Sequence, residues 1–132
     1  MLLVKTSIKA SPHHGFGLFA EEKILKGART WLFVEKFDVM FDDADLSRLR
    51  ALSPAAAESV ENFLYQSPVS KLFILCGDNA RYMNHSEDPN TSGGYSAEDP
   101  EGFDIATRDI EIGEELTCNY KTFDLAVSHK GI

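Results

Sequence analysis

A chain of 132 residues, 43% hydrophobic and 26% charged, has the composition of one packed globular domain. Its formal net charge of −8 argues against a surface that binds nucleic acid, because phosphate binding needs clustered Lys and Arg. No stretch approaches the roughly twenty apolar residues of a membrane span, and the first residues lack the apolar core of a signal peptide, so we expect an intracellular protein that contacts neither nucleic acid nor membrane.

The N-terminal third of the chain predicts short strands separated by glycine turns. Residues 2–11 alternate well enough for a strand, which the turn at residues 13–17 closes. Two further strands are expected at residues 18–24 and 30–37, since both segments are rich in aromatic and β-branched residues. Gly27 lies between them, where a tight turn needs a positive φ.

The middle of the chain changes to helical spacing. Residues 45–52 carry apolar side chains three to four positions apart, which predicts a helix. Ser53 followed by Pro54 is typical of an N-cap and a first helical position. A second helix is therefore expected from Pro54 to about Tyr65.

The last part of the chain predicts strands again. Residues 71–76 form an apolar run that ends in a turn at residues 77–79, which indicates a buried strand. Two more strands are expected at residues 103–107 and 115–120, on either side of a turn at Gly113.

Residues 81–102 form an irregular segment of 22 residues between these strands. Such a long loop in a small domain is usually functional or disordered. Its run Arg81-Tyr82-Met83-Asn84-His85-Ser86 is not the composition of a flexible linker. Asn84-His85-Ser86 alone would ordinarily be interpreted as a polar turn. The segment as a whole is nevertheless where we expect the functional site.

Metal and nucleophile chemistry find little support in the sequence. His13 and His14 are adjacent and would point apart in an extended chain, and neither Cys76 nor Cys118 has a ligand at zinc spacing. We therefore expect no metal site, and no disulfide between the two cysteines. A nucleophile pair of either cysteine with His85 stays open, because catalytic partners need only meet in space; a buried structural cysteine is the favoured interpretation.

A set of motifs in chain order resembles the SET-domain family of protein lysine methyltransferases. Gly15-Phe16-Gly17 alone is a weak signal, and it lacks the third glycine and the helix of a dinucleotide-binding loop. The resemblance depends on the whole series, which runs from about Lys5 to Phe123: Gly15-Phe16-Gly17-Leu18-Phe19-Ala20, Arg81-Tyr82-Met83-Asn84-His85-Ser86 with Pro89-Asn90, Ala106-Thr107-Arg108-Asp109, and Gly113-Glu114-Glu115-Leu116-Thr117 leading to Tyr120.

The resemblance implies a mainly β fold of several short sheets with a C-terminal pseudoknot and a small helical insert. The whole chain, residues 1–132, would be a single SET domain with its variable insert at about residues 37–70. In this fold the Asn84-His85 segment and the segment that ends at Tyr120 come together, although chain threading is rare in proteins.

The family also implies S-adenosylmethionine as the cofactor. By resemblance, the cofactor-binding residues are Gly15, Phe16, Gly17, Arg81, Asn84, His85, Tyr120 and Phe123. The glycines would let the backbone approach the cofactor, Asn84 and His85 would fix its polar ends, and Phe123 is a candidate for packing on its adenine. A small ligand held by backbone donors and a few aimed polar groups is physically consistent with this set.

The implied reaction is methyl transfer to the side-chain amine of lysine in a protein, a histone or another basic protein being the expected partner. Tyr120 matches the family's catalytic tyrosine, which orients the amine and the departing methyl group. Tyr65, Tyr82 and Cys118 are our candidates for the channel that receives the lysine, since aromatic walls suit an aliphatic stem that ends in a cation. Cys118 stands where the family often has Phe or Tyr, and its smaller side chain leads us to expect higher methylation states.

One departure from the family leaves alternatives open. Many members carry a zinc-ligating cysteine after Asn-His-Ser and a cysteine-rich tail that closes the lysine channel, whereas this chain has Glu87 and no such tail. Residues 121–132, a second copy in a homodimer, or nothing at all would then close it. The alternative function is a SET-like module that binds a cofactor or a protein without turnover.

Overall fold

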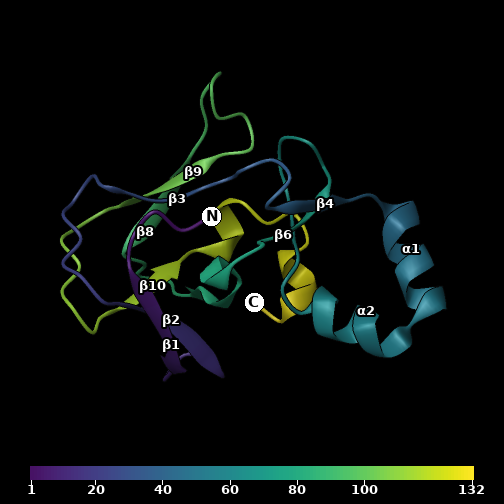
Figure 1. Cartoon of the computed structure of the whole chain (residues 1–132), viewed down its shortest axis with the longest axis horizontal. Helices are drawn as coiled ribbons and strands as arrows, with labels where there is room; N and C mark the ends of the chain where they lie inside the picture. The colour runs from purple at the N-terminus through teal and green to yellow at the C-terminus, as the bar shows by residue number, and fades with distance from the viewer.

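The computed structural model describes residues 1–132 and consists of three small sheets and two short helices. Figure 1 shows the helices at one end of the molecule and most of the strands at the other. The largest sheet has the order β1-β2-β10-β7, formed by Thr6–Ala10, Phe16–Ala20, Glu115–Cys118 and Asn84–His85. The other two are β3-β9-β8, formed by Arg29–Leu32, Phe103–Ala106 and Thr91–Gly94, and β4-β6-β5, formed by Val39–Phe41, Phe73–Leu75 and Tyr65–Gln66.

Strand β10 is the central element of the largest sheet. It pairs antiparallel with β2, where Leu116 lies opposite Leu18, and parallel with β7, where Cys118 lies opposite His85. Leu116 and Leu18 are fully buried in the main hydrophobic core. The pairing brings the Asn84–His85 segment against the segment that leads to Tyr120, as predicted, so the fold itself joins two distant parts of the sequence.

Helix α2 begins at the predicted cap, whereas helix α1 begins at Asp43, two residues before the predicted start. Helix α1 spans Asp43–Leu52 and starts at the N-cap Asp42, whose carboxylate accepts a hydrogen bond from the backbone N–H of Asp45 at 2.7 Å. Helix α2 spans Pro54–Glu61 and is capped by Ser53, as expected from the Ser-Pro pair. None of the chain's helices has the length and apolar character needed to cross a membrane.

Helix α2 is shorter than the sequence predicted. It ends at Glu61, and Tyr65 lies in strand β5 instead of completing the helix. Residues 65 and 66 pair with β6, whose residues Phe73 and Ile74 lie opposite them. Backbone pairing with a neighbouring strand therefore overrides the helical spacing at this point, and it turns the Tyr65 side chain toward the body of the protein.

Other boundaries also differ from the predicted ones. The first strand covers residues 6–10 rather than 2–11, and β3 ends at Leu32 rather than near Phe37. The chain turns away after β3 because the buried carboxylate of Asp38 accepts the backbone N–H of Val34 at 2.9 Å. Strand β2 begins at Phe16 instead of Leu18, so part of the expected glycine turn is strand.

The segment 81–102 is more regular than its composition indicated. It contains strands β7 and β8, and the short 3₁₀ helix η1 (Asn79–Tyr82) enters it. Asn90, which is 3% exposed, ties the segment to β10: its side chain donates to the carbonyl of Glu115 at 2.8 Å and accepts from the N–H of Thr117 at 2.9 Å. Tertiary hydrogen bonds, not local propensity, order this loop.

Replacing Asn90 with Ala should therefore destabilise the fold strongly. The substitution leaves a buried carbonyl and a buried N–H of β10 without partners, and we expect the free energy of unfolding to fall by about 2 kcal/mol or more. Urea unfolding followed by circular dichroism measures the change. Ser92→Ala, at an exposed position of β8, is the control and should have almost no effect; equal stability of the two variants would contradict the role assigned to Asn90.

Candidate active site

Two cavities meet at Tyr120. The smaller one, of about 90 Å³, lies among the three sheets, and the larger one, of about 1200 Å³, lies between the residue 13–16 loop and the C-terminal segment. Tyr120 lines both, as do Phe63, Arg81 and Lys130. A residue with one side toward each cavity can align two reactants that enter from opposite sides.

Tyr120 is held by two hydrogen bonds, one from its side chain and one from its backbone. Its hydroxyl donates to the carbonyl of Met83 at 2.6 Å, and its backbone N–H donates to Nδ1 of His85 at 3.1 Å. Burial raises the pKa of Tyr120 above its ordinary value, with the nearby Cys118 adding to the effect. The hydroxyl therefore stays protonated and can act as a hydrogen-bond donor or acceptor, but not as a strong base.

His85 lies in the larger cavity, and its contacts determine which ring nitrogen carries the hydrogen. Because Nδ1 accepts the N–H of Tyr120, the ring hydrogen sits on Nε2, which is 3.3 Å from a carboxylate oxygen of Glu87. Glu87 also pairs with Lys121, and these two partners hold the pKa of its carboxyl below the ordinary value. The residue that departs from the family pattern thus contacts the Asn-His motif directly.

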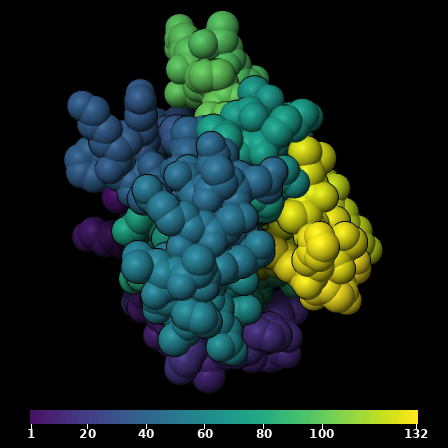
Figure 2. Space-filling view, turned by 90° about the vertical axis from the view of Figure 1, so that its right-hand side faces the viewer, coloured from purple at the N-terminus to yellow at the C-terminus, as the bar shows by residue number.

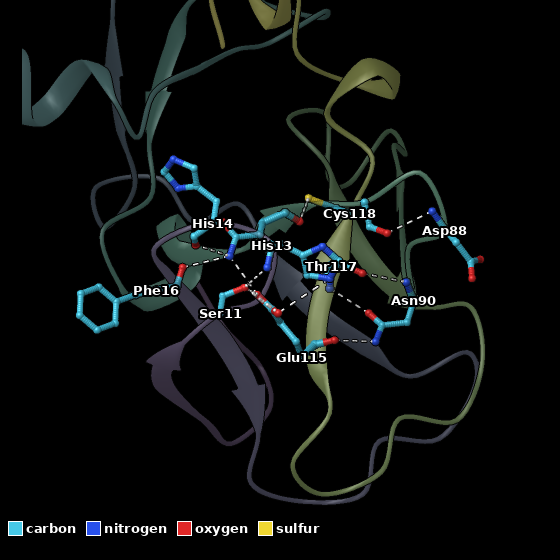
Figure 3. A network of polar contacts seen from close by, with 11 residues as sticks. Ser11, His13, His14, Phe16, Asp88, Asn90, Glu115, Thr117 and Cys118 are labelled. Atoms are coloured by element: carbon cyan, nitrogen blue, oxygen red, sulfur yellow. Dashed lines mark hydrogen bonds and ion pairs between the residues drawn. The ribbon is translucent and has the colours of Figure 1, made fainter. Parts of the chain in front are cut away.

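Asn84 ties the residue 13–16 loop to the central strand. Its side-chain amide donates to the carbonyls of His14 and Phe16, at 3.1 and 3.0 Å, and to the Glu115 carboxylate at 2.9 Å. Figure 3 shows Glu115 at the centre of this network, where the Ser11 hydroxyl also reaches its carboxylate at 2.8 Å. The amide nitrogen of Asn84 therefore positions the loop, and only its oxygen is free to face a ligand.

The two glycines of the loop have different physical roles. A Cβ on Gly17 would lie 2.0 Å from a carboxylate oxygen of Glu115, so this glycine makes room for the buried acid. A Cβ on Gly15 would meet no atom within 4 Å, but its φ of +46° is one that glycine favours. Gly15 lines the larger cavity together with Phe16, whose exposed ring points away from the network (Figure 3).

The structure separates the predicted channel residues into two places. Tyr65 and Cys118 line the smaller cavity, where Tyr65 packs edge to face on Phe123 with 5.3 Å between ring centroids. Tyr82 instead lines the larger cavity and packs against Phe63 at 5.2 Å, under the guanidinium of Arg81. Phe123, predicted to pack on a cofactor, lines the smaller cavity.

The C-terminal segment supplies walls to both cavities. Figure 2 shows residues near the C-terminus packed beside the helical end of the molecule. The segment forms two 3₁₀ helices, η2 (Tyr120–Thr122), which begins at Tyr120 itself, and η3 (Val127–Lys130). The N–H of Leu125, between them, donates to the carbonyl of Gln66 at 3.1 Å and holds the segment in place. The ammonium of Lys130 lies 4.7 Å from the centroid of the Tyr120 ring and 2.8 Å from the buried carboxylate of Asp124. Residues 121–132 therefore line both cavities, with Phe123 in the smaller one, Leu125 and His129 in the larger one, and Lys130 in both.

Two acidic residues of the smaller cavity were missed by the sequence analysis. Glu101 and Asp104 both line it, and the Ser67 hydroxyl donates to the Glu101 carboxylate at 2.8 Å. Burial raises the pKa of Asp104 from its ordinary 3.8 to about 6. No motif marks these residues, because Asp104 stands inside a strand and Glu101 inside a turn. No group of three or more His, Cys, Asp and Glu side chains comes together in a way that could hold a metal ion.

Comparisons with known proteins agree with this geometry. The sequence profile of the SET domain matches residues 15–121. Three solved structures match over most of this chain: a Chaetomium thermophilum Polycomb Repressive Complex 2 chain bound to S-adenosylmethionine (24% identity, TM-score 0.67, 96% of this chain and 16% of that one), the Neurospora SET-domain histone lysine methyltransferase DIM-5 (22%, 0.59, 90% and 53%), and a proposed histone methyltransferase of Plasmodium falciparum (18%, 0.59, 90% and 95%). No curated protein matches the chain.

The fold is that of the SET-domain structures, with several small sheets around a site formed by two distant segments. The chain belongs to the SET-domain family, as the profile match over 107 residues, from 15 to 121, shows. It spans 16% of the length of the Polycomb chain.

The two loop glycines give a paired test. Gly17→Ala should displace the Glu115 carboxylate and release the loop, so binding at the larger cavity should weaken by about tenfold or more, since a buried charge loses its partners. Gly15→Ala should cost only about 1 kcal/mol of backbone strain and leave Glu115 in place. Calorimetric titration of S-adenosylmethionine compares the two variants. Equal weakening by both would contradict the separate roles.

Asp104→Asn should stabilise the protein near neutral pH. An acid whose pKa is raised in the folded state binds more protons folded than unfolded, so its contribution to stability falls as the pH rises from about 4 to about 6. At pH 7 the variant should be more stable by about 1 to 3 kcal/mol, and at pH 4 the gain should disappear. Urea unfolding at both pH values measures this. Asp88→Asn, at a side chain that is 97% exposed, should change nothing, and a gain that is the same at both pH values would contradict the burial of Asp104.

Proposed function

We propose that this protein transfers the methyl group of S-adenosylmethionine to the side-chain amine of a lysine in a basic protein. The observation that carries the proposal is the position of Tyr120 between a narrow cavity and a wide one. A sulfonium methyl group is displaced in line by an amine, so the two reactants must approach from opposite sides. Family membership supports the same reaction, because the family's chemistry is methyl transfer to lysine.

The larger cavity fits S-adenosylmethionine in its donor set. It offers the backbone of Gly15 and Phe16 beside open space, the ring of His85, the oxygen of Asn84 and the exposed ring of Phe16. These are the backbone and polar groups, with one apolar face, that a nucleoside and an amino-acid end need. When bound there, the cofactor supplies an electrophilic methyl group.

The chain's own residues align the amine and exclude water. Tyr65, Phe123 and Cys118 wall the smaller cavity with apolar surface, which suits the aliphatic stem of lysine. An amine with an ordinary pKa of about 10.4 must lose its proton before attack, and a poorly hydrated cavity favours the neutral form. The Tyr120 hydroxyl, held at 2.6 Å from the Met83 carbonyl, is placed to orient the amine.

The charge of the protein and of the smaller cavity indicates the class of substrate. The formal net charge of −8 and the carboxylates of Glu101 and Asp104 in the smaller cavity favour a positively charged partner over an acidic one. A histone tail or another Lys-rich protein has this chemistry. Pairing of two copies stays a prediction, which sedimentation at working concentration tests.

The decisive experiment follows methyl incorporation by mass spectrometry in a mixed set of basic proteins, with calorimetric titration of S-adenosylmethionine alongside. We expect methylated lysines, and we expect Tyr120→Phe to lower kcat by about a hundredfold while cofactor affinity changes little, since one orienting hydroxyl is lost. Tyr95→Phe removes a hydroxyl at the exposed rim of the smaller cavity and should cost much less.

Each outcome discriminates between the functions considered. Cofactor binding without transfer to any basic protein would favour the alternative, a SET-like binding module without turnover. Absence of cofactor binding would contradict both the proposed reaction and the assignment of the larger cavity. Transfer that Tyr120→Phe leaves unchanged would remove Tyr120 from the mechanism.

A further inference from the structure

A row of three residues crosses the β3-β9-β8 sheet beneath the smaller cavity. In the strand register Trp31 of β3 lies opposite Asp104 of β9, and Asp104 lies opposite Gly93 of β8. Residues that lie opposite one another in antiparallel strands project from the same face of the sheet. All three line the smaller cavity, so this face is its wall.

Two polar groups in this row have no partner in the protein. The Nε1 hydrogen of Trp31 is buried without a hydrogen-bond acceptor, although the residue is only 7% exposed. The carboxylate of Asp104 receives no hydrogen bond from the protein, and although the residue is only half-buried, this burial raises the pKa of its carboxyl. Gly93, opposite it, has no side chain that could cover it. Unpaired polar groups in an apolar cavity cost free energy, and a polar ligand that pairs with them would recover it.

No cation of the protein forms an ion pair with Asp104, although the Met1 ammonium, which pairs with Asp38 at 3.2 Å, lowers its pKa. Of the two cations that line the cavity, Lys130 pairs with Asp124 at 2.8 Å, and the guanidinium of Arg81 lies over the rings of Phe63 and Tyr82. The second acid of the cavity, Glu101, already accepts a hydrogen bond from Ser67. Asp104 is therefore the free anion of the cavity.

We propose that Asp104 receives the ammonium group of the target lysine and so selects a cationic side chain for the smaller cavity. The cavity is narrow and walled by aromatic rings, which fits an unbranched aliphatic stem, and its carboxylate fits the charge at the end. The inference deepens the proposed function and rests on it for the identity of the target. Holding the charged form stabilises the bound substrate without helping the amine to lose its proton, so Asp104→Asn should raise KM and should not lower kcat.

The pH dependence follows from Asp104. Desolvation raises its pKa to about 6, so the free protein presents a carboxylate above this pH and a neutral acid below it. Affinity for a lysine side chain should therefore fall as the pH drops from about 7 to 5. The other charged or titratable groups near Asp104 are the Met1 ammonium, Glu101, Arg81, Lys130, Tyr65, Tyr95, Cys76 and Cys118. Burial raises the pKa values of these tyrosines and cysteines, so none of them loses its proton in this range.

The experiment measures binding directly, without the cofactor or turnover. The probes are an acetylated, amidated Ala-Ala-Lys-Ala-Ala peptide and the same peptide with norleucine, which keeps the stem and lacks the charge. Trp31 is the only tryptophan of the chain, so its single indole N–H resonance in a ¹H–¹⁵N spectrum reports on the cavity. Wild type, Asp104→Asn and the surface control Asp88→Asn are titrated at pH 7.5 and pH 5.

We expect the lysine peptide to shift the Trp31 resonance in the wild type and in Asp88→Asn, with about tenfold tighter binding than the norleucine peptide at pH 7.5. The preference should shrink at pH 5 and be absent from Asp104→Asn at both pH values. Equal binding of the two peptides, no binding of the lysine peptide at millimolar concentration, or a preference that survives in Asp104→Asn would each overturn the proposal.

A parallel methyl-transfer assay separates this proposal from the proposed function. If transfer to lysine occurs but Asp104→Asn leaves KM unchanged, the reaction stands and the role of Asp104 fails. If no basic protein is methylated while the Asp104-dependent lysine preference is present, the cation site stands and the reaction fails. The variant is not at risk of unfolding, because it removes a desolvated charge.

Discussion

The site depends on the hydrogen bonds that surround the buried carboxylate of Glu115. Its side chain is 8% exposed, and a charge so placed must be surrounded by donors. Ser11 before the loop and Asn84 in β7, which are far apart in sequence, provide them, and the His13 ring in the loop lies 3.9 Å from the carboxylate. Satisfying this one acid therefore fixes the loop, the Asn-His strand and the central strand relative to one another.

The same strand carries the constraint to Tyr120. Glu115 begins β10, and Tyr120 follows the end of that strand, where its backbone N–H meets His85. Parallel pairing with β7 sets the distance between the two motifs, and the C-terminal segment then folds back over Tyr120. Two cavities with a shared wall are the outcome, and Tyr120 is one of the four residues that form this wall.

The smaller cavity retains a group that the fold does not need. A carboxylate at Asp104 with a raised pKa lowers stability near neutral pH, and an apolar residue would pack at lower cost. Sites that are less stable than they could be are commonly sites of function. Under the proposed function this cavity receives the lysine side chain, so its position and the charge of Asp104 support the same proposed role.

The sequence by itself determined the family, the mainly β architecture and the approximate order of strands and helices. These follow from local patterns: glycine turns, a Ser-Pro helix start, and motifs whose residues are adjacent in the chain. The helix that stops at Glu61, the strand at Tyr65 and the order of segment 81–102 were decided by pairing with distant strands. The separation of Tyr82 from Tyr65 and Cys118, the position of Phe123 in the smaller cavity and the unpaired Asp104 were decided in the same way. A local pattern records propensity, whereas the neighbours that pair with a strand or desolvate a carboxylate come from elsewhere in the chain and exist only in the folded protein.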